Sequence, residues 1–375
     1  MSTTQLAESP DFVRLSTAAD MALGFSPGGF YRGAQLYCVN LLLYFTDGCK
    51  ANCLYCGQAR EAAGEAACKT LIRVEWPLRS LEDVACRLRS LIRGGCFQRP
   101  YRACVASITN GRAVDAEREV IARLYRSLRI PLTALITPTL FTKPRMEELA
   151  DAGAERIGIA IDCATPEIFD ALRGRGARGP HRWEVYRRGV VDAVSVLGEG
   201  KVGIHLIVGL GETEEEAARL IQWAHDVGAE THLFSFYPEP GSALEGWARP
   251  SLSQYRRVQL ARYLIDMGYS SVDDFEFNEH GQIVGFGLSK ARLEDVIRGG
   301  EPFMTSGCPG CNRPYANERP GEEPRNYPFK PSPLDVARIR RQLWRYEPPS
   351  NTFHDLRAYL RSVKEPSLSR AQPSA

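Results

Sequence analysis

The sequence predicts an α/β barrel in which eight parallel strands alternate with helices. Two observations lead to this prediction: short apolar, β-branched runs recur along most of the chain, and amphipathic stretches of helical period separate them. Eight such runs favour a (β/α)8-type barrel over an open doubly wound sheet, and no glycine-rich dinucleotide fingerprint follows the first run. The 375 residues suffice for one barrel of this kind.

The elements follow one another in a regular order along the chain. The expected strands are 38–46, 103–109, 131–137, 156–161, 201–209, 231–236, 272–277 and 302–307. Helical patterns lie between them, for example at 81–94, 116–128 and 214–228. Beyond residue 312 the chain is rich in Pro, Gly and Asn, which predicts an irregular segment before two closing helices at 333–347 and 352–363. We therefore expect an N-terminal extension (1–37), a barrel (38–307) and a C-terminal segment (308–375).

Composition excludes several classes of protein. The formal net charge is only +2, so no bulk charge favours binding to nucleic acid or to an acidic membrane surface. No apolar run approaches the roughly 20 residues that span a bilayer. The N-terminus lacks a basic region followed by an apolar one, as a signal peptide would have. We expect a cytoplasmic protein with neither nucleic acid nor membrane as a partner.

Eleven cysteines are many for a chain of this length. An odd, uneven set fits a disulfide framework poorly, and a reducing cytoplasm opposes one. Five of the cysteines fall in two tight groups, which are Cys49, Cys53 and Cys56, then Cys308 and Cys311. Metal binding is the natural interpretation of this grouping.

The first group lies in "TDGCKANCLYCGQA", directly after the first predicted strand. In a barrel, loops at the C-terminal ends of the strands build the active site. Three thiolates are one short of a closed zinc site, and the stretch contains no histidine to complete it. They suit a [4Fe–4S] cluster with one open iron, although the spacing alone also permits a structural zinc or iron–sulfur site.

The C-x3-C-x2-C pattern, with Tyr55 before its last cysteine, resembles the radical S-adenosylmethionine (SAM) superfamily. The resemblance implies a barrel whose open iron binds the amino and carboxylate groups of SAM. One electron then cleaves SAM to methionine and a 5′-deoxyadenosyl radical. The electron would come from a reducing partner of the flavodoxin or ferredoxin type.

Other stretches extend the resemblance over about 38–312. "KVGIHLIVGLGET" (201–213) is similar to the family's G-x-I-x-G-x-x-E segment, in which Ile207 packs on the adenine. "AIDCATPEIFDAL" (160–172) offers Asp162 as the ribose contact, with a helix-capping carboxylate as the alternative. "SIT" (107–109) replaces the usual Gly-Gly-Glu, so backbone contacts to the methionyl amino group are expected there. The full set of expected cofactor-binding residues is Tyr55, Ser107, Thr109, Asp162, Arg173, Ile207 and Phe236.

Several of these stretches are most similar to biotin synthase, which holds a second, sacrificial iron–sulfur cluster with cysteines inside its barrel. Only Cys104 has a counterpart here, and the strand-five position is Gly203. A second cluster of the biotin-synthase type is therefore not expected.

The second group of cysteines lies in "TSGCPGCNRPYANERP" (305–320). We expect Cys308 to cap the eighth strand, on the same face as the opening loop. A Cys-Pro-Gly-Cys turn points two thiolates at one metal, and Arg313 and Arg319 offer charges for a carboxylate or phosphate. We interpret the turn as part of an auxiliary [4Fe–4S] cluster, against the alternatives of a zinc knuckle or a reversible dithiol.

This turn and the opening stretch together resemble archaeal-type two-protein lipoyl synthases, which insert sulfur at unactivated carbons. The resemblance implies that Cys308 and Cys311 take part in catalysis through that cluster. Cys104 is the expected third ligand, Cys163 is a rival, and Cys38 is expected at the wrong end of the first strand. Period-two alternation places His205 on the barrel-lining side, where it would contact substrate or a cluster sulfide unless it is an ordinary core histidine.

The sequence therefore predicts a radical SAM sulfurtransferase that breaks a C–H bond and inserts sulfur from a sacrificial cluster. The substrate is either an octanoyl group on a carrier protein or a small molecule such as a sugar or nucleoside. The alternative is a carbon-skeleton mutase of the methylornithine synthase type, which needs no second cluster. A non-catalytic iron–sulfur or zinc protein is a third hypothesis.

Overall fold

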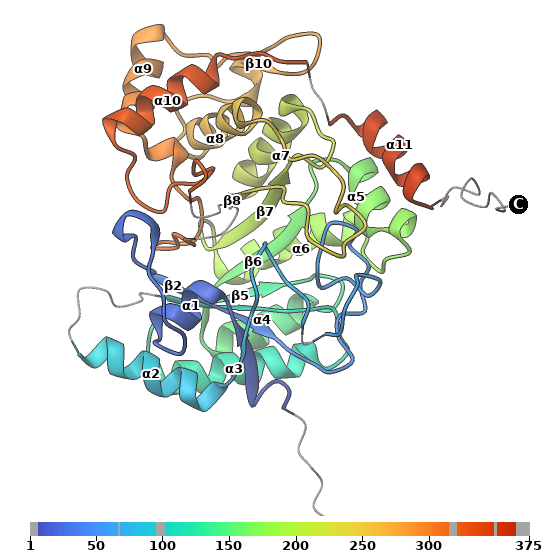
Figure 1. Cartoon of the computed structure of the whole chain (residues 1–375), viewed down its shortest axis with the longest axis vertical. Coiled ribbons are helices and arrows are strands. Elements are labelled where there is room, and N and C mark those ends of the chain that lie inside the picture. The colour runs from blue at the N-terminus through green and yellow to red at the C-terminus, as the bar shows by residue number, and fades with distance from the viewer. Residues whose placement is uncertain (1–6, 67, 95–101, 315–320, 349–350, 365–375) are drawn as a thin grey trace, which may run out of the picture.

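An eight-stranded, mostly parallel sheet forms the core of the chain (Figure 1). The computed structural model describes residues 7–66, 68–94, 102–314, 321–348 and 351–364. The strand order is β3-β1-β2-β4-β5-β6-β7-β8; β1 is antiparallel to both its neighbours, and the strands from β2 to β8 pair in parallel. Their bounds are β1 Phe12–Leu15, β2 Cys38–Leu43, β3 Leu78–Ser80, β4 Arg102–Ala106, β5 Leu132–Ile136, β6 Ala154–Asp162, β7 Val202–Val208 and β8 Ala229–Ser235.

Helices cover the outer face of the sheet. In chain order they are α1 Thr17–Ala22, α2 Leu81–Arg93, α3 Ala113–Leu128, α4 Lys143–Ala152, α5 Pro166–Arg173, α6 Trp183–Leu197, α7 Glu214–Asp226, α8 Leu252–Asp266, α9 Lys290–Gly299, α10 Pro333–Leu343 and α11 Phe353–Lys364. Figure 1 shows α8, α9 and α10 grouped beyond β8, while α2 and α3 lie at the opposite end of the molecule. The parallel strands are largely apolar, as expected for strands with helices on one face and a buried interior on the other.

The predicted α/β architecture is confirmed as a mostly parallel sheet with helices, but the predicted number of parallel strands was wrong. Six parallel strands, rather than eight, form the main part of the sheet, and the edge strands β3 and β8 do not pair with each other in the described chain. The stretch 272–277 begins with a helical turn, Val272–Asp274, because Ser271 and Asp274 cap each other. Only Glu276–Phe277 (β9) extends, and it pairs with Ile283–Gly285 (β10) in a separate hairpin. The stretch 302–307 contributes one isolated bridge, between Met304 and Tyr327.

The C-terminal segment that carries the second cysteine pair runs to the N-terminal ends of the barrel strands. The Leu233 amide in β8 donates to Ser306 Oγ at 2.7 Å. The Tyr37 amide, just before β2, donates to Asn312 Oδ1 at 3.2 Å, and Asn312 Nδ2 donates to the Gln35 carbonyl. These bonds place Ser306 beside β8 and Asn312 beside the start of β2. Within the described part of the chain, no helix has the length and apolar character needed to cross a membrane.

Candidate functional site: two cavities that share the barrel interior

The three closely spaced cysteines lie in the loop that leaves the C-terminal end of β2. The Cys56 amide donates to the Cys53 carbonyl at 2.9 Å, and the Lys50 amide donates to the Thr109 carbonyl at 2.6 Å. The Gln58 amide donates to the Cys56 sulfur at 3.4 Å. Burial raises the pKa of Cys53 to about 11, so this thiol becomes a thiolate only when a metal binds it.

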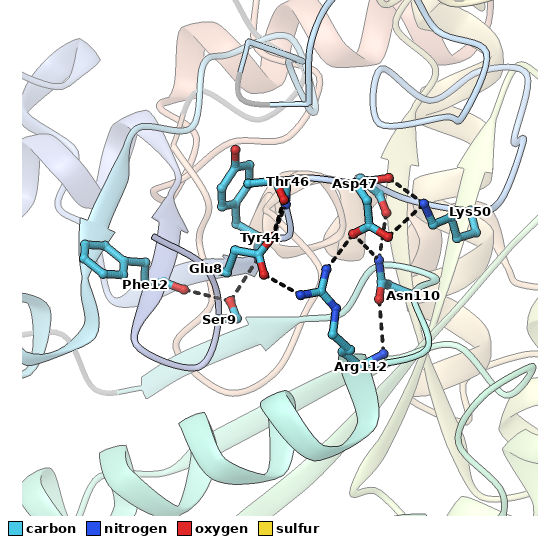
Figure 2. Close-up of polar contacts among 10 residues, drawn as sticks. Glu8, Ser9, Phe12, Tyr44, Thr46, Asp47, Lys50, Asn110 and Arg112 are labelled. Atoms are coloured by element: carbon cyan, nitrogen blue, oxygen red, sulfur yellow. Dashed lines mark hydrogen bonds and ion pairs between the residues drawn. The ribbon is translucent and has the colours of Figure 1, made fainter. Parts of the chain in front are cut away.

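A polar network fixes the start of this loop (Figure 2). Arg112, at the start of α3, pairs with Glu8 and with Asp47, the latter at 2.6 Å. Asn110 Nδ2 also donates to Asp47 Oδ1 at 3.0 Å, and the Thr46 amide donates to Glu8 Oε1 at 2.6 Å. The N-terminal extension and the β4–α3 connection thus hold the loop from two sides.

A cavity of about 1190 Å³, here called the upper cavity, opens at the C-terminal ends of the parallel strands. Cys49, Cys53 and Cys56 line it. It is also lined by every residue that the family resemblance assigns to the cofactor, namely Tyr55, Ser107, Thr109, Asp162, Arg173, Ile207 and Phe236. The structure brings the predicted set together around one space, and the individual roles stay predictions.

Asp162, the last residue of β6, points its carboxylate into the upper cavity. Tyr55 Oη donates to Asp162 Oδ2 at 2.6 Å, and Arg173 Nη1 donates to the same oxygen at 2.9 Å. No hydrogen bond reaches Oδ1 from the described residues. The backbone of Asp162 is left-handed, with φ of 63°, a conformation that concentrates at functional sites. The alternative role as a helix cap was wrong, because Thr165 Oγ1 caps α5 instead.

Arg173 is held by a buried network that the sequence did not indicate. Its Nη1 donates to the Ile161 carbonyl at 3.0 Å, and its Nη2 donates to Tyr186 Oη at 3.0 Å. Tyr186 Oη lies 2.5 Å from Thr137 Oγ1 and 3.1 Å from His181 Nδ1. Burial, with the nearby Arg173 charge, lowers the pKa of His181 to about 2, so this imidazole is neutral. In the sequence, the one feature that could have indicated this network is a single histidine, His181, just before α6.

The glycine-rich turn after β7 is closed by its own glutamate. Glu212 Oε1 accepts from the Gly209 amide at 2.6 Å, and Oε2 accepts from the Leu210 amide at 2.9 Å. Gly209 has φ of 106°, and a Cβ there would lie 2.6 Å from Pro250 Cδ. Glu212 therefore supports the turn, while Ile207 from the same stretch faces the cavity.

A tight hairpin at Leu71–Val74 covers the barrel interior. Ile72 and Arg73 form its tip with φ of 50° and 70°, which is unusual for residues other than glycine and costly for a β-branched one. Glu239, beyond β8, holds the tip by accepting from the Arg73 amide and, at 2.8 Å, from Thr70 Oγ1. Nothing in the sequence predicted this hairpin.

A second cavity of about 920 Å³, here called the lower cavity, lies deeper in the barrel. Four cysteines from three distant parts of the chain line it: Cys38, Cys104, Cys308 and Cys311. The Cys38 thiol hydrogen-bonds Cys311, and Thr133 Oγ1 donates to the Cys308 sulfur at 3.5 Å. The Cys311 amide donates to the Cys308 carbonyl at 2.8 Å, which closes the turn between them.

Positive charge surrounds this group of cysteines. The hydrogen bond from Cys38, together with the charges of Arg313 and Arg102, lowers the pKa of Cys311 to about 6. Arg102 Nη1 donates to Thr133 Oγ1 at 3.0 Å, behind Cys308. The predicted Arg319 lies outside the described residues.

Two expectations about these cysteines were wrong. The Cys308–Cys311 turn does not share a face with the opening loop, because Asn312 anchors it at the start of β2. Cys38, the first residue of β2, was expected to lie too far from the Cys308–Cys311 turn, because the turn was expected at the C-terminal ends of the strands. Cys38 instead lines the lower cavity together with Cys104, Cys308 and Cys311. Cys163 does not: it is fully buried near Cys53 and Asp162 and lines neither cavity. Cys104 lies where the sequence placed it.

His205 lies at the junction and lines both cavities. Its ring stacks at 4.8 Å from that of Phe234 and 5.5 Å from that of His232, a residue that the sequence did not single out. Burial lowers the pKa of both histidines, so both are neutral. A Cβ on Gly203 would lie 2.7 Å from His232 Nε2, so the glycine leaves the space that this ring fills.

The donor sets of both cavities fit iron–sulfur clusters better than a single metal ion. Among the described residues, no three His, Cys, Asp or Glu side chains converge as ligands of one ion. A [4Fe–4S] cluster does not require such convergence, because each cysteine binds a different iron. The upper cavity offers three thiolates and the lower cavity four.

Comparisons with known proteins point in one direction. Residues 43–224 match the family model described as "Radical SAM superfamily". The chain is 22% identical over 201 residues to a GTP 3′,8-cyclase of Limosilactobacillus fermentum, covering 52% of this chain and 55% of that protein. It is 27% identical over 173 residues to a GTP 3′,8-cyclase of Rhodopseudomonas palustris, covering 44% of each. The chain thus spans about half the length of the curated relatives it matches.

Solved structures are similar at low identity. The [FeFe]-hydrogenase maturase HydG has a TM-score of 0.46 at 15% identity, covering 66% of this chain and 54% of that one. The radical SAM methyltransferase TsrM from Kitasatospora setae has a TM-score of 0.38 at 17% identity, covering 76% and 56%. The matched range 43–224 contains the cysteine loop, Asp162 and Ile207 of the upper cavity. Residues 43–224 of the chain are therefore a radical SAM region.

Proposed function

We propose that this radical SAM enzyme is a sulfurtransferase that forms a C–S bond at an unactivated carbon. The observation that supports this proposal most is the lower cavity. Four cysteines line it, and some of its other lining residues also line the upper cavity. A radical SAM region implies a [4Fe–4S] cluster and SAM, for which the upper cavity has the matching residues. When bound, they supply a 5′-deoxyadenosyl radical that removes a hydrogen atom from the substrate.

In this proposal, the residues of the upper cavity hold and orient the cofactor. Cys49, Cys53 and Cys56 bind the three protein-ligated irons. Asp162 Oδ1 accepts a hydrogen bond from a ribose hydroxyl, while Tyr55 and Arg173 occupy Oδ2 and fix the carboxylate. Separately, the apolar side chains of Ile207 and Phe236 contact the adenosyl group, and the backbone at Ser107 and Thr109 meets the methionyl amino group.

The four cysteines of the lower cavity are assigned to an auxiliary [4Fe–4S] cluster. Its thiolates would come from Cys38, Cys104, Cys308 and Cys311, with a hydrogen bond from Thr133 to the Cys308 sulfur. When bound, this cluster supplies the sulfur atom and accepts the electron left over when a carbon radical forms a C–S bond. Because Cys38 also lines the lower cavity, the chain itself can provide a cysteine ligand for each of the four irons of this cluster.

The junction of the two cavities favours an aliphatic substrate. The residues that line both are Leu71, Ile72, Ala106, Leu135, His205 and Phe234. A carbon that reacts with the radical and then with cluster sulfur has to pass this point. Five of the six side chains are apolar, which suits an octanoyl group on a carrier protein better than a sugar or nucleoside. His205 is the polar contact available to the substrate there.

The other hypotheses leave observations unexplained. A mutase of the methylornithine synthase type has no use for four cysteines beside the junction. A reaction like that in the relatives' name requires a triphosphate site, yet within the described residues each cavity is lined by one arginine and no lysine. A one-electron donor of the flavodoxin or ferredoxin type and a carrier protein are the partners that our proposal requires.

The test is an anaerobic reaction of the reconstituted enzyme with SAM, dithionite and a peptide bearing octanoyl-lysine. We expect 5′-deoxyadenosine and a peptide whose mass has gained sulfur. Cys104→Ala should still release 5′-deoxyadenosine but yield no thiolated peptide, because it alters only the lower cavity. Cys86→Ala is the matched control, since Cys86 is exposed on α2. A thiolated product from Cys104→Ala at the wild-type rate would refute the lower cavity as the source of the sulfur. 5′-Deoxyadenosine with no sulfur gain in wild type would refute sulfur transfer to this substrate.

A further inference from the structure

Arg313 is a half-buried cation at the edge of the lower cavity. Its guanidinium lies 4.1 Å from the centre of the Phe234 ring, and its Nη2 donates to the Ser306 carbonyl at 2.8 Å. Its Nε is buried and has no hydrogen-bond acceptor among the described residues. The backbone is left-handed, with φ of 33°, as the chain turns away from Cys311 toward the ring.

Neighbouring arginines at this end of the barrel have carboxylate partners, and Arg313 has none among the described residues. Arg102 pairs with Glu155 at 2.9 Å, and Arg156 pairs with Glu230. A half-buried charge with no counter-charge among the described residues is unfavourable, so a negative group in the lower cavity would stabilise Arg313. The electrostatic influence of Arg313 falls on Cys104, Cys311, His205 and His232.

A four-thiolate [4Fe–4S] cluster is the counter-charge that the lower cavity can provide. Four thiolates outweigh the charge of the oxidised iron–sulfur core, so the whole cluster is doubly negative. Its charge becomes more negative by one unit on one-electron reduction. A fixed cation beside it stabilises the reduced form more than the oxidised form. The Phe234 ring and the Ser306 carbonyl keep this cation in place.

We propose that Arg313 is a positioning residue for the auxiliary cluster, holding its reduction potential high enough to accept an electron during C–S bond formation. This inference rests on the proposed function, because it requires the auxiliary cluster. The competing role for Arg313 is to bind a carboxylate of the substrate. That role predicts no change in the cluster when substrate is absent.

The experiment measures the potential of the auxiliary cluster alone. In the full chain carrying Cys49→Ala, Cys53→Ala and Cys56→Ala, only the lower cavity retains its cysteine ligands. After anaerobic reconstitution, this protein is titrated with dithionite and followed by electron paramagnetic resonance, without SAM or substrate. Arg313→Met removes the charge, Arg313→Lys keeps it, and Arg262→Met is the control, because Arg262 pairs with Asp266 on α8 and lines neither cavity.

We expect Arg313→Met to shift the midpoint to lower potential, so that the ratio of reduced to oxidised cluster at a fixed potential falls by about tenfold. Arg313→Lys should retain most of the wild-type value, and Arg262→Met all of it. Iron loss from Arg313→Met but not from Arg313→Lys also supports the inference, because only the lysine variant keeps a positive charge at residue 313. An unchanged midpoint in Arg313→Met, or equal iron loss in both variants, overturns it. A different outcome is that the protein carrying only Cys49→Ala, Cys53→Ala and Cys56→Ala binds no iron. That result would show that the lower cavity holds no cluster, and it would refute the proposed function as well as the role of Arg313.

Discussion

Gly203→Ala tests whether the His232 ring occupies the space that the glycine leaves in the lower cavity. The new Cβ would lie 2.7 Å from His232 Nε2 and 2.9 Å from Nδ1, and closer still to Cε1. Ordinary contacts of this kind are about 3.5–4 Å, so the ring has to shift by roughly an ångström. His232 is only 3% exposed and lies beside His205, so its ring can shift only into the lower cavity that it lines. Overpacking of this kind costs about 1–3 kcal/mol of unfolding free energy.

The assay is denaturant unfolding of the reconstituted protein, with two comparisons. Gly29→Ala should be near neutral, because a Cβ there meets no atom within 4 Å. Adding Gly203→Ala to His232→Ala should cost less than about 0.5 kcal/mol, since the obstructing ring is gone and the two changes are coupled. Equal costs for Gly203→Ala in the presence and absence of the His232 ring would refute the reasoning.

Three further predictions concern the upper cavity. Asp162→Asn should weaken SAM binding, measured by equilibrium dialysis, while the iron content stays at the wild-type level; a parallel loss of iron would contradict a ribose contact. Arg112→Met should slow iron incorporation at the Cys49 loop, because Asp47 and Glu8 lose their shared partner, and incorporation at the wild-type rate would argue against that role of the network. Burial raises the pKa of Glu212 from 4.5 to about 7, so its contribution to the free energy of unfolding is fully present below about pH 4.5 and is lost as the pH rises through 7. Glu212→Gln should remove a pH dependence of the unfolding free energy of about 3 kcal/mol between those limits. An unchanged pH profile of unfolding in this variant would contradict the prediction.

The residues that the sequence assigned to the cofactor line one cavity because they are local to strand ends. Cys49, Asp162 and Ile207 each follow or end a strongly apolar strand, and parallel strands bring such positions to one edge. The buried network behind Arg173 was not predictable in the same way. Tyr186 and His181 come from α6 and the segment before it, and only tertiary packing brings them to the guanidinium.

The lower cavity was predicted in part. The resemblance to biotin synthase indicated that Cys104 faces the interior, and Cys104 lines the lower cavity. The position of the Cys308–Cys311 turn was wrong because it depended on an eighth strand that does not form. Asn312 and Ser306 determine where this segment packs, and neither residue type carries a signal of its long-range partner. Cys38 was misjudged for the same reason.

The hairpin tip at Ile72 and Arg73 shows a different limit. Two adjacent residues other than glycine with positive φ contradict local propensity, so no turn rule selects them. The conformation persists because Glu239 and the packing of Leu71 hold it against the barrel. Such sites are where local sequence reasoning is expected to fail.

The central claim is that the lower cavity holds a second iron–sulfur cluster. The most direct measurement is iron and sulfide content after anaerobic reconstitution of wild type and of a variant in which Cys38, Cys104, Cys308 and Cys311 are all replaced by alanine. We predict about eight irons in wild type and about four in the variant, with the Cys86→Ala control at about eight. About four irons in all three proteins would contradict the claim, and with it the case for sulfur insertion.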